Sequence, residues 1–129
     1  MIRAVARVLR PFCLFAFSDW ITQGELSAEE RSSQARIWSV PALLRVSEYV
    51  RRLDESGFDV LLAEDRTPAV AARPQSEAPD QQEWERVFAA RYGVAEIECQ
   101  REPGRVWRAL VQARRTGHAL FVARRSAEA

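Results

Sequence analysis

The apolar run over residues 12–17 is the feature that most constrains what this chain can fold into. It is short and rich in aromatic residues, with Pro11 before it and Ser18-Asp19 after it. A continuous apolar run of this length, bounded by two breaks, is typical of a β-strand buried on both faces, as in a parallel sheet covered by helices. Such a strand needs a neighbouring strand on each edge, so the rest of the chain has to supply its partners.

Length and charge narrow the class of protein. A chain of 129 residues forms one domain with its own core. The net charge of +1 gives no strong attraction to nucleic acid or to a membrane surface, and no run reaches the ~18 apolar residues of a membrane span. One histidine and two cysteines, Cys13 and Cys99, do not form a metal-ligand set. Nothing calls for an oxidising compartment, so we expect a cytoplasmic protein.

The first 18 residues share some features with a targeting segment, because Arg3, Arg7 and Arg10 precede the apolar run and no acid is present. However, the apolar run is very short, Pro11 interrupts it, and no small-residue cleavage site follows. We therefore interpret this segment as folded structure.

Helical spacing occurs on both sides of the first apolar run. Residues 2–9 have apolar side chains at helical spacing, and Pro11 ends that helix. Ser27 and Glu30 form a capping-box pattern that predicts a short helix after them. Residues 41–56 follow a helical period up to Gly57, with Ser47 as an alternative start for a second short helix.

The second half of the chain predicts two more strands. Residues 58–67 start apolar and become polar, as expected of a strand, and residues 68–79 form a Pro/Ala-rich loop. Residues 80–92 predict a helix that opens with Asp80 and Glu83 and closes at Gly93.

The remaining segment is less regular. Residues 94–100 fit either a helix or a short strand, and Pro103-Gly104 predicts a break. A further helix runs from Val106 to Gly117, and residues 118–125 form the last strand. The chain is therefore a single α/β domain with about three strands and flanking helices, and it contains no internal repeat.

Three segments, in this order, resemble class I S-adenosylmethionine-dependent methyltransferases. Residues 6–11 (ARVLRP) with the strand and Ser18-Asp19-Trp20 are similar to the segment that leads into the fifth strand of that sheet. Residues 47–60 are similar to the helix that ends in a glycine and feeds the sixth strand, and residues 117–125 (GHALFVARR) to the closing strand. The resemblance implies a partial Rossmann-like sheet whose last strand inserts antiparallel between the other two. It is closest to N-methyltransferases of small amines such as glycine derivatives or phosphoethanolamine.

The sequence departs from that family in two ways. The family has two glycines where this chain has Phe12-Cys13, so we expect the turn to be rebuilt or the join between helix and strand to be moved. The five glycines, at positions 24, 57, 93, 104 and 117, include no G-x-G cluster after a strand. The resemblance therefore implies that the cofactor-binding half is absent and that this chain alone does not bind S-adenosylmethionine tightly.

The candidate substrate-binding residues are Asp19, Trp20, Trp38 and Tyr49. Asp19-Trp20 follows the first predicted strand, and open α/β sheets bind ligands at the carboxyl ends of their strands. Trp38 and Tyr49 would complete an aromatic wall that holds a methylated amine through cation–π attraction, although all four residues also fit ordinary packing roles.

Other polar residues are weaker candidates. Glu64-Asp65 ends the second strand and either orients an amine or is a solvated strand end. We expect the only histidine, His118, to lie at the opposite edge of the sheet from the ligand, because its strand is antiparallel. The arginine pairs at 51–52, 114–115 and 124–125 predict solvated faces rather than a nucleic-acid site.

Three functional hypotheses follow. In the first, this chain is the C-terminal part of a truncated or split methyltransferase, inactive alone, that contributes the substrate side for transfer to a small acceptor. In the second, it is a non-catalytic module that associates with itself or with another chain through the open edge of the strand at 12–17. In the third, it is a stand-alone α/β binding protein.

Overall fold

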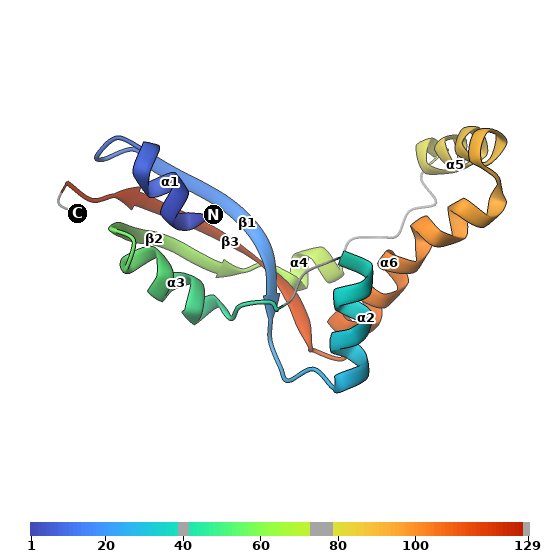
Figure 1. Ribbon diagram of the computed structural model, residues 1–129, viewed down its shortest axis with the longest axis horizontal. Helices are drawn as coiled ribbons and strands as arrows, with labels where there is room; N and C mark the ends of the chain where they lie inside the picture. Colours follow the sequence, from blue (N-terminus) through green and yellow to red (C-terminus); the bar gives the residue numbers. More distant parts are fainter. Residues whose placement is uncertain (39–41, 73–78, 128–129) are drawn as a thin grey trace.

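A computed structural model describes residues 1–38, 42–72 and 79–127. Three strands form one sheet: β1 (Leu14–Thr22), β2 (Phe58–Asp65) and β3 (Thr116–Arg125). The strand order is β1-β3-β2, and β3 is antiparallel to both neighbours. The predicted α/β sheet, with the last strand inserted between the other two, is therefore confirmed (Figure 1).

The helices gather in two places. Two of them lie beside the sheet: α1 (Ile2–Val8) and α3 (Val46–Asp54). The others lie beyond the end of the sheet where β1 stops: α2 (Ala28–Trp38), α4 (Thr67–Ala71), α5 (Pro79–Tyr92) and α6 (Val94–Gln112). The long α6 extends away from the sheet and carries α5 at its far end (Figure 1).

The main core lies between α1, α3 and one face of the sheet. Its buried residues come from both helices and from all three strands: Ile2, Ile21, Tyr49, Leu53, Phe58, Ala119, Phe121 and Ala123. The prediction that the first strand is buried on both faces is wrong, since burial along β1 alternates and Leu14 is 61% exposed. The strand is apolar on both faces, but among the described residues helices α1 and α3 cover only one of them, and a β-strand sends alternate side chains to opposite faces.

The predicted helix starts are partly confirmed. The backbone N–H of Ser27 donates to Oε2 of Glu30 at 2.7 Å, and that of Glu30 donates to Oγ of Ser27 at 3.1 Å, so the capping box of α2 is present.

The prediction that the next helix spans 41–56 is wrong at its start, because α3 begins at Val46. Before it, the carbonyl of Leu44 accepts a hydrogen bond from the N–H of Thr22 at 3.0 Å, which keeps this segment beside β1. Asp80 lies in α5, but its side chain is outside the described residues.

Two predicted breaks are wrong. Part of the predicted loop at 68–79 forms α4, with Pro68 in its first turn, where proline has no helical N–H bond to lose; residues 73–78 lie outside the described part. Pro103-Gly104 lies inside the continuous α6. Proline removes one backbone bond there, and Ile97 and Leu110 are buried on either side of it, so packing holds the helix together.

The end of α6 also differs from the prediction. The helix stops at Gln112, and Arg114 takes the left-handed conformation (φ 54°) that was expected of a glycine. The N–H of Arg115 donates to the carbonyl of Leu110 at 2.8 Å, and the N–H of Arg114 donates to Val111 at 3.0 Å. This is a Schellman cap. Gly117, the predicted helix end, lies inside β3 instead.

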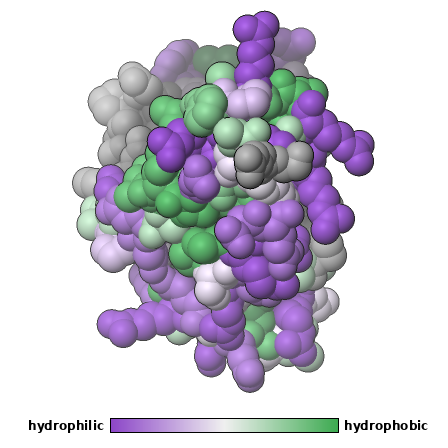
Figure 2. Space-filling model, turned by 90° about the vertical axis from the view of Figure 1, so that its left-hand side faces the viewer, coloured by the Kyte–Doolittle hydropathy of each residue, from purple (hydrophilic) through white to green (hydrophobic). Residues whose placement is uncertain are grey.

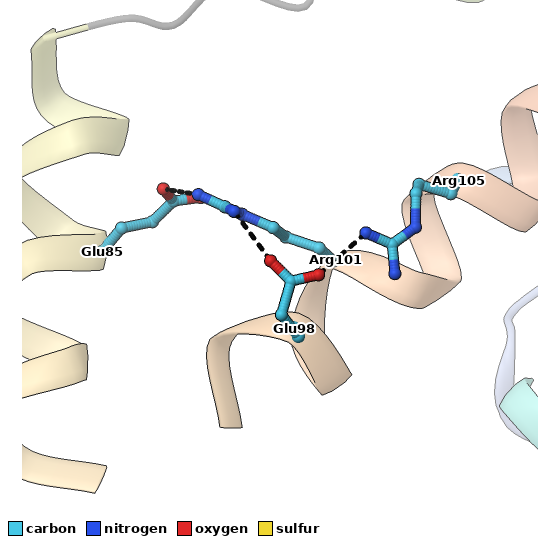
Figure 3. A network of polar contacts seen from close by, with 4 residues as sticks. All are labelled: Glu85, Glu98, Arg101 and Arg105. Carbon is cyan, nitrogen blue, oxygen red and sulfur yellow. Dashed lines mark hydrogen bonds and ion pairs between the residues drawn. The ribbon is translucent and has the colours of Figure 1, made fainter. Parts of the chain in front are cut away.

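Helices α5 and α6 are joined by ion pairs around Arg101 (Figure 3). Its guanidinium bonds Glu85 of α5 at 2.5 Å and Glu98 of α6 at 2.9 Å, and Glu98 also bonds Arg105 at 3.0 Å. The two arginines hold the pKa of Glu98 below its usual value, mainly through these hydrogen bonds. Exposed ion pairs each contribute little, so this cluster links the two helices but adds little to the stability of the fold.

The turn between α1 and β1 keeps a left-handed residue although the chain has no glycine there. Phe12 has φ 65°, and its N–H donates to the carbonyl of Arg125 at 2.8 Å. The chain therefore accommodates a left-handed residue at this turn without a glycine. A non-glycine residue in this conformation costs about 1–2 kcal/mol, so the strand pairing on either side must offset that strain.

The first prediction concerns Gly117, where a Cβ atom would collide with Oγ1 of Thr67. Thr67 is buried and hydrogen-bonded, so it cannot move away freely. We expect Gly117→Ala to lower the free energy of unfolding by about 1–3 kcal/mol in urea denaturation. Gly104→Ala is the matched control, because nothing lies near that Cβ and alanine favours the helix; it is expected to add about 0.5–1 kcal/mol. Equal effects of the two changes would contradict the placement of Gly117.

The second prediction concerns the strain at Phe12. We expect Phe12→Gly to raise the free energy of unfolding by about 0.5–1 kcal/mol, since relief of the left-handed strain exceeds the added entropy of the unfolded chain. Phe12→Ala is the control, because it removes the exposed ring but keeps the strained conformation. A gain for alanine as large as that for glycine would show that the ring, rather than the backbone, is responsible.

Candidate functional site

The structure brings Asp19 and Tyr49 together. Asp19 lies in β1 on the face covered by α3, and Tyr49 is one turn into α3. The Tyr49 hydroxyl donates a hydrogen bond to Oδ2 of Asp19 at 2.5 Å. Tyr49 is buried and its ring also packs on Phe17 and Phe121, so the aromatic core fixes the position of this pair.

The surroundings of Tyr49 favour its neutral form. Burial raises the pKa of Tyr49 well above its ordinary value of 10.0, and the hydrogen bond to the Asp19 carboxylate and its negative charge raise it further. The positive charge of Arg52 opposes this rise. Tyr49 is therefore a hydrogen-bond donor at neutral pH that holds the Asp19 carboxylate in place.

A hollow of about 550 Å³ opens beside this pair. Its walls come from the start of α1, from Leu44 and from the last turns of α3. Three arginines, Arg3, Arg51 and Arg52, line it together with Asp19 and Tyr49. Glu55 also lines the hollow and bonds Arg51 at 3.2 Å. Asp19 beside the guanidinium groups of Arg3 and Arg52 suits a small molecule that carries both an amine and an acidic group.

Trp20 does not join this site. It lies within β1 rather than after it, so the expectation that Asp19-Trp20 follows the strand end is wrong. Its ring meets Trp107 of α6 edge-on and lies 5.6 Å from the ring of His118. Successive residues of a strand point to opposite faces, which places Trp20 on the other face from Asp19. Trp38 is the last residue of α2, and its side chain lies outside the described residues.

A second polar cluster lies where β1 and β2 end. Nε2 of Gln23 donates to Oδ2 of Asp65 at 2.6 Å, and the N–H of Thr67 donates to Oδ1 of Asp65 at 2.8 Å. Burial raises the pKa of Asp65, but hydrogen bonds from Thr67 and Gln23 outweigh it and hold the pKa below its usual value. The neighbouring Glu64 pairs with Arg66 at 2.9 Å. These groups satisfy one another, and Gln23, Asp65 and Thr67 also line a second hollow of about 530 Å³.

His118 lies at the same end of the strands as this cluster, so the expectation that it lies at the opposite end from the ligand-binding strand ends is wrong. It pairs with Trp20, and its N–H donates to Oγ1 of Thr67 at 3.0 Å. An antiparallel strand starts where its neighbours end, so β3 begins beside the carboxyl ends of β1 and β2. The histidine ring packs on Trp20, whereas Asp19 and Tyr49 lie on the other face.

Sequence reasoning missed the arginines of the hollow. It assigned Arg51 and Arg52 to a solvated face, and both are indeed exposed, but they also line the hollow. The signal that could have found Arg52 is its spacing of three residues from Tyr49, which puts both side chains on one side of α3. No comparable signal marks Arg3, because its position at the hollow depends on how α1 packs against the sheet.

The described residues contain no group of three or more His, Cys, Asp or Glu side chains that could hold a metal ion. Within the same residues, no helix combines the length and the apolar character needed to cross a bilayer.

Comparisons with known proteins identify the fold. No protein-family profile matches the sequence, and no curated protein does. Among solved structures, 97% of the chain superposes on phosphoethanolamine N-methyltransferase 2 from Haemonchus contortus, solved with phosphomonomethylethanolamine and S-adenosylhomocysteine, with a TM-score of 0.78 and 15% identity. It also superposes on a protein from Galdieria sulphuraria described as a sarcosine dimethylglycine methyltransferase, with a TM-score of 0.72 and 16% identity. The fold is that of part of a class I S-adenosylmethionine-dependent methyltransferase.

The chain spans 29% of the Haemonchus protein and 46% of the Galdieria protein. A further match is the [4+2]-cyclase SpnF, with a TM-score of 0.55, 22% identity and 43% of its length covered. Proteins with different reactions therefore share this fold, and the residues of the hollow have to carry any argument about function.

The third prediction tests the Tyr49–Asp19 pair. We expect Tyr49→Phe to lower the free energy of unfolding by about 1–3 kcal/mol at neutral pH, because it removes a buried hydrogen bond to a charged group. The raised pKa of Tyr49 means that this contribution is complete below pH 10.0, the ordinary value, and declines as the pH rises above it. Urea denaturation across this range measures the difference.

Tyr92→Phe is the matched control, since Tyr92 is exposed on α5 and the same hydroxyl is removed. We expect it to change the free energy of unfolding by less than about 0.5 kcal/mol at any of these pH values. A loss for Tyr49→Phe that stays constant above pH 10.0 would contradict the role assigned to the pair.

Proposed function

We propose that this chain is the C-terminal, substrate-side part of an S-adenosylmethionine-dependent methyltransferase and that it contributes the acceptor site rather than the cofactor site. The complete enzyme would methylate a small amine. The Asp19–Tyr49 pair in an arginine-lined hollow is the observation that carries the proposal, because it supplies a fixed anion for the amine within a methyltransferase fold.

The cofactor side of the proposal rests on the glycines. A Rossmann-like fold brings the backbone close to its cofactor at a glycine-rich turn after the first strand. No two of the five glycines in this sequence form such a turn. S-adenosylmethionine, as the methyl donor of the complete enzyme, would therefore be held by residues from another polypeptide or segment.

The acceptor side of the proposal rests on the hollow. The Asp19 carboxylate, oriented by Tyr49, would hold the acceptor nitrogen, and Arg3 and Arg52 would hold an acidic group of the same molecule. The main role of such a site is to position the nitrogen, because the rate of methyl transfer between bound reactants depends chiefly on their orientation. Trp20 and Trp38, predicted from the sequence, are not needed for this arrangement.

The fourth prediction follows the chain by NMR and calorimetric titration with three probes: S-adenosylmethionine, sarcosine and phosphomonomethylethanolamine. We expect no tight complex with S-adenosylmethionine, and weak binding of at least one amine with shifts at residues of the hollow. Asp19→Asn can still accept the Tyr49 hydrogen bond but has no charge, so we expect at least a tenfold loss of amine affinity, about 1.4 kcal/mol.

The control is Asp54→Asn, which removes the same charge from an exposed position of α3 that does not line the hollow. We expect it to leave amine binding unchanged. A tight one-to-one complex of the unmodified chain with S-adenosylmethionine would sink the cofactor side of the proposal. Equal amine affinity of Asp19→Asn and the unmodified chain would sink the acceptor side.

A further inference from the structure

The second hollow, of about 530 Å³, lies where β2 ends and α4 begins. It shares no residue with the hollow at Asp19. It is also far along β2 from the end of the molecule that faces the viewer in Figure 2, where a band of apolar surface is bordered by charged residues. A hollow of this volume suits a small organic molecule, so the chemistry of its walls decides which class of molecule it binds.

One wall of the second hollow carries a carboxylate whose partners are neutral. Asp65 accepts hydrogen bonds from Nε2 of Gln23 at 2.6 Å and from the N–H of Thr67 at 2.8 Å. Burial raises the pKa of Asp65, but these bonds outweigh it and hold the pKa below its usual value, so the group is charged at neutral pH. No cation within the described residues pairs with it, and the neighbouring Arg66 pairs with Glu64. An ammonium group of a ligand would supply the missing positive charge.

β3 fixes the two donors that hold this carboxylate. Gly117 leaves room for both, because a Cβ atom there would collide with Oγ1 of Thr67 and would lie 2.9 Å from Cδ of Gln23. The N–H of His118 donates to Oγ1 of Thr67 at 3.0 Å, and Thr67 is buried. The carboxylate is therefore held in place before a ligand arrives, which lowers the entropic cost of binding.

Arg114, just after the end of α6, lines the same hollow. Its φ of 54° is a left-handed conformation that a glycine would adopt without strain, so the side chain is what an arginine adds at this position. Among the residues that the structure describes, its guanidinium has no hydrogen-bond or ion-pair partner, whereas the adjacent Arg115 pairs with Glu30 at 3.8 Å. An unpaired guanidinium suits a carboxylate, which it binds through two parallel hydrogen bonds.

The two charges of the hollow are separate from each other. Asp65 and Arg114 line it together but do not form an ion pair, so a ligand that neutralises both has to span the space between them. Apart from Gln23 and Thr67, the rest of the lining is apolar and consists of Pro68, Ala71 and Val111. These walls favour an aliphatic chain, because its burial removes apolar surface from water.

We propose that the second hollow binds a linear ω-amino acid, with an ammonium group at one end of an aliphatic chain and a carboxylate at the other. Asp65 binds the ammonium group, Arg114 binds the carboxylate, and the chain lies on the apolar walls. The site is separate from the hollow at Asp19, so the proposal stands independently of the proposed methyltransferase role.

The fifth prediction follows NMR titrations of the full chain with δ-aminopentanoate, pentylamine and pentanoate. We expect saturable binding of δ-aminopentanoate, with shifts at the amides of Thr67 and Arg114. Pentylamine lacks the carboxylate and pentanoate lacks the ammonium group, so we expect each to bind at least tenfold more weakly. Glycine carries both charges without the aliphatic chain, and we expect it not to bind in this hollow.

Two variants test the two ends of the ligand separately. Arg114→Gly removes the guanidinium and suits the left-handed backbone, so it is expected to fold and to abolish the advantage of δ-aminopentanoate over pentylamine. Asp65→Asn can still accept from the N–H of Thr67, and it is expected to abolish the advantage over pentanoate. The matched controls are Phe12→Gly, which relieves the same kind of strain elsewhere, and Asp59→Asn, which removes a carboxylate from the same strand. Both controls are expected to bind δ-aminopentanoate as the unmodified chain does.

Three results would overturn the proposal. The first is no saturable binding of δ-aminopentanoate up to about 10 mM. The second is binding that shifts the amides around Asp19 instead of those around Thr67. The third is an advantage over pentylamine or pentanoate that persists in the variant made to abolish it. Circular dichroism checks that all four variants are folded.

Discussion

Every hydrogen bond between strands of this sheet involves β3. Because β1 and β2 each pair with β3 and not with each other, the sheet exists only when Thr116–Arg125 has been inserted between them. The pairs between β1 and β3 therefore join residues about 100 positions apart, such as Phe17 and Phe121, and those between β2 and β3 join residues about 60 apart. Closing such a long loop costs conformational entropy, which the burial of Ala119, Phe121 and Ala123 has to offset.

The same insertion arranges the candidate site. β3 places the small Ala119 opposite Asp19 on one side and Asp65 on the other, so the two carboxylates share a face but are separated by a whole strand. Each carboxylate accepts two hydrogen bonds: Asp65 accepts from Gln23 and Thr67, and Asp19 accepts from the Tyr49 hydroxyl and from the N–H of Trp20. Both carboxylates line a hollow, of about 550 Å³ at Asp19 and about 530 Å³ at Asp65, and Asp19 is the one that has Arg3 and Arg52 in the same lining.

Local signals in the sequence were enough for some elements. Ser27 and Glu30 bond each other's backbone within one turn, and Gly57 takes the left-handed conformation after α3, so both could be predicted from neighbouring residues alone. The strand order came from the family resemblance, because no local rule fixes where β3 inserts. The prediction failed where packing overrides local preference, as at Pro103 in α6, Arg114 at its cap and Phe12 in a left-handed turn.

The site was half predictable for a related reason. Asp19 and Tyr49 could be named from the sequence, yet the prediction grouped them with Trp20, which the alternation of β1 sends to the other face. The error came from ending the strand at residue 17, four positions before the last buried residue of β1, Ile21. Because β1 continues to Thr22, the consecutive residues Asp19 and Trp20 point to opposite faces of the sheet. One of them then meets α3 and an arginine-lined hollow, and the other meets α6 and His118, so the length of β1 decides which chemistry each face of this sheet can support.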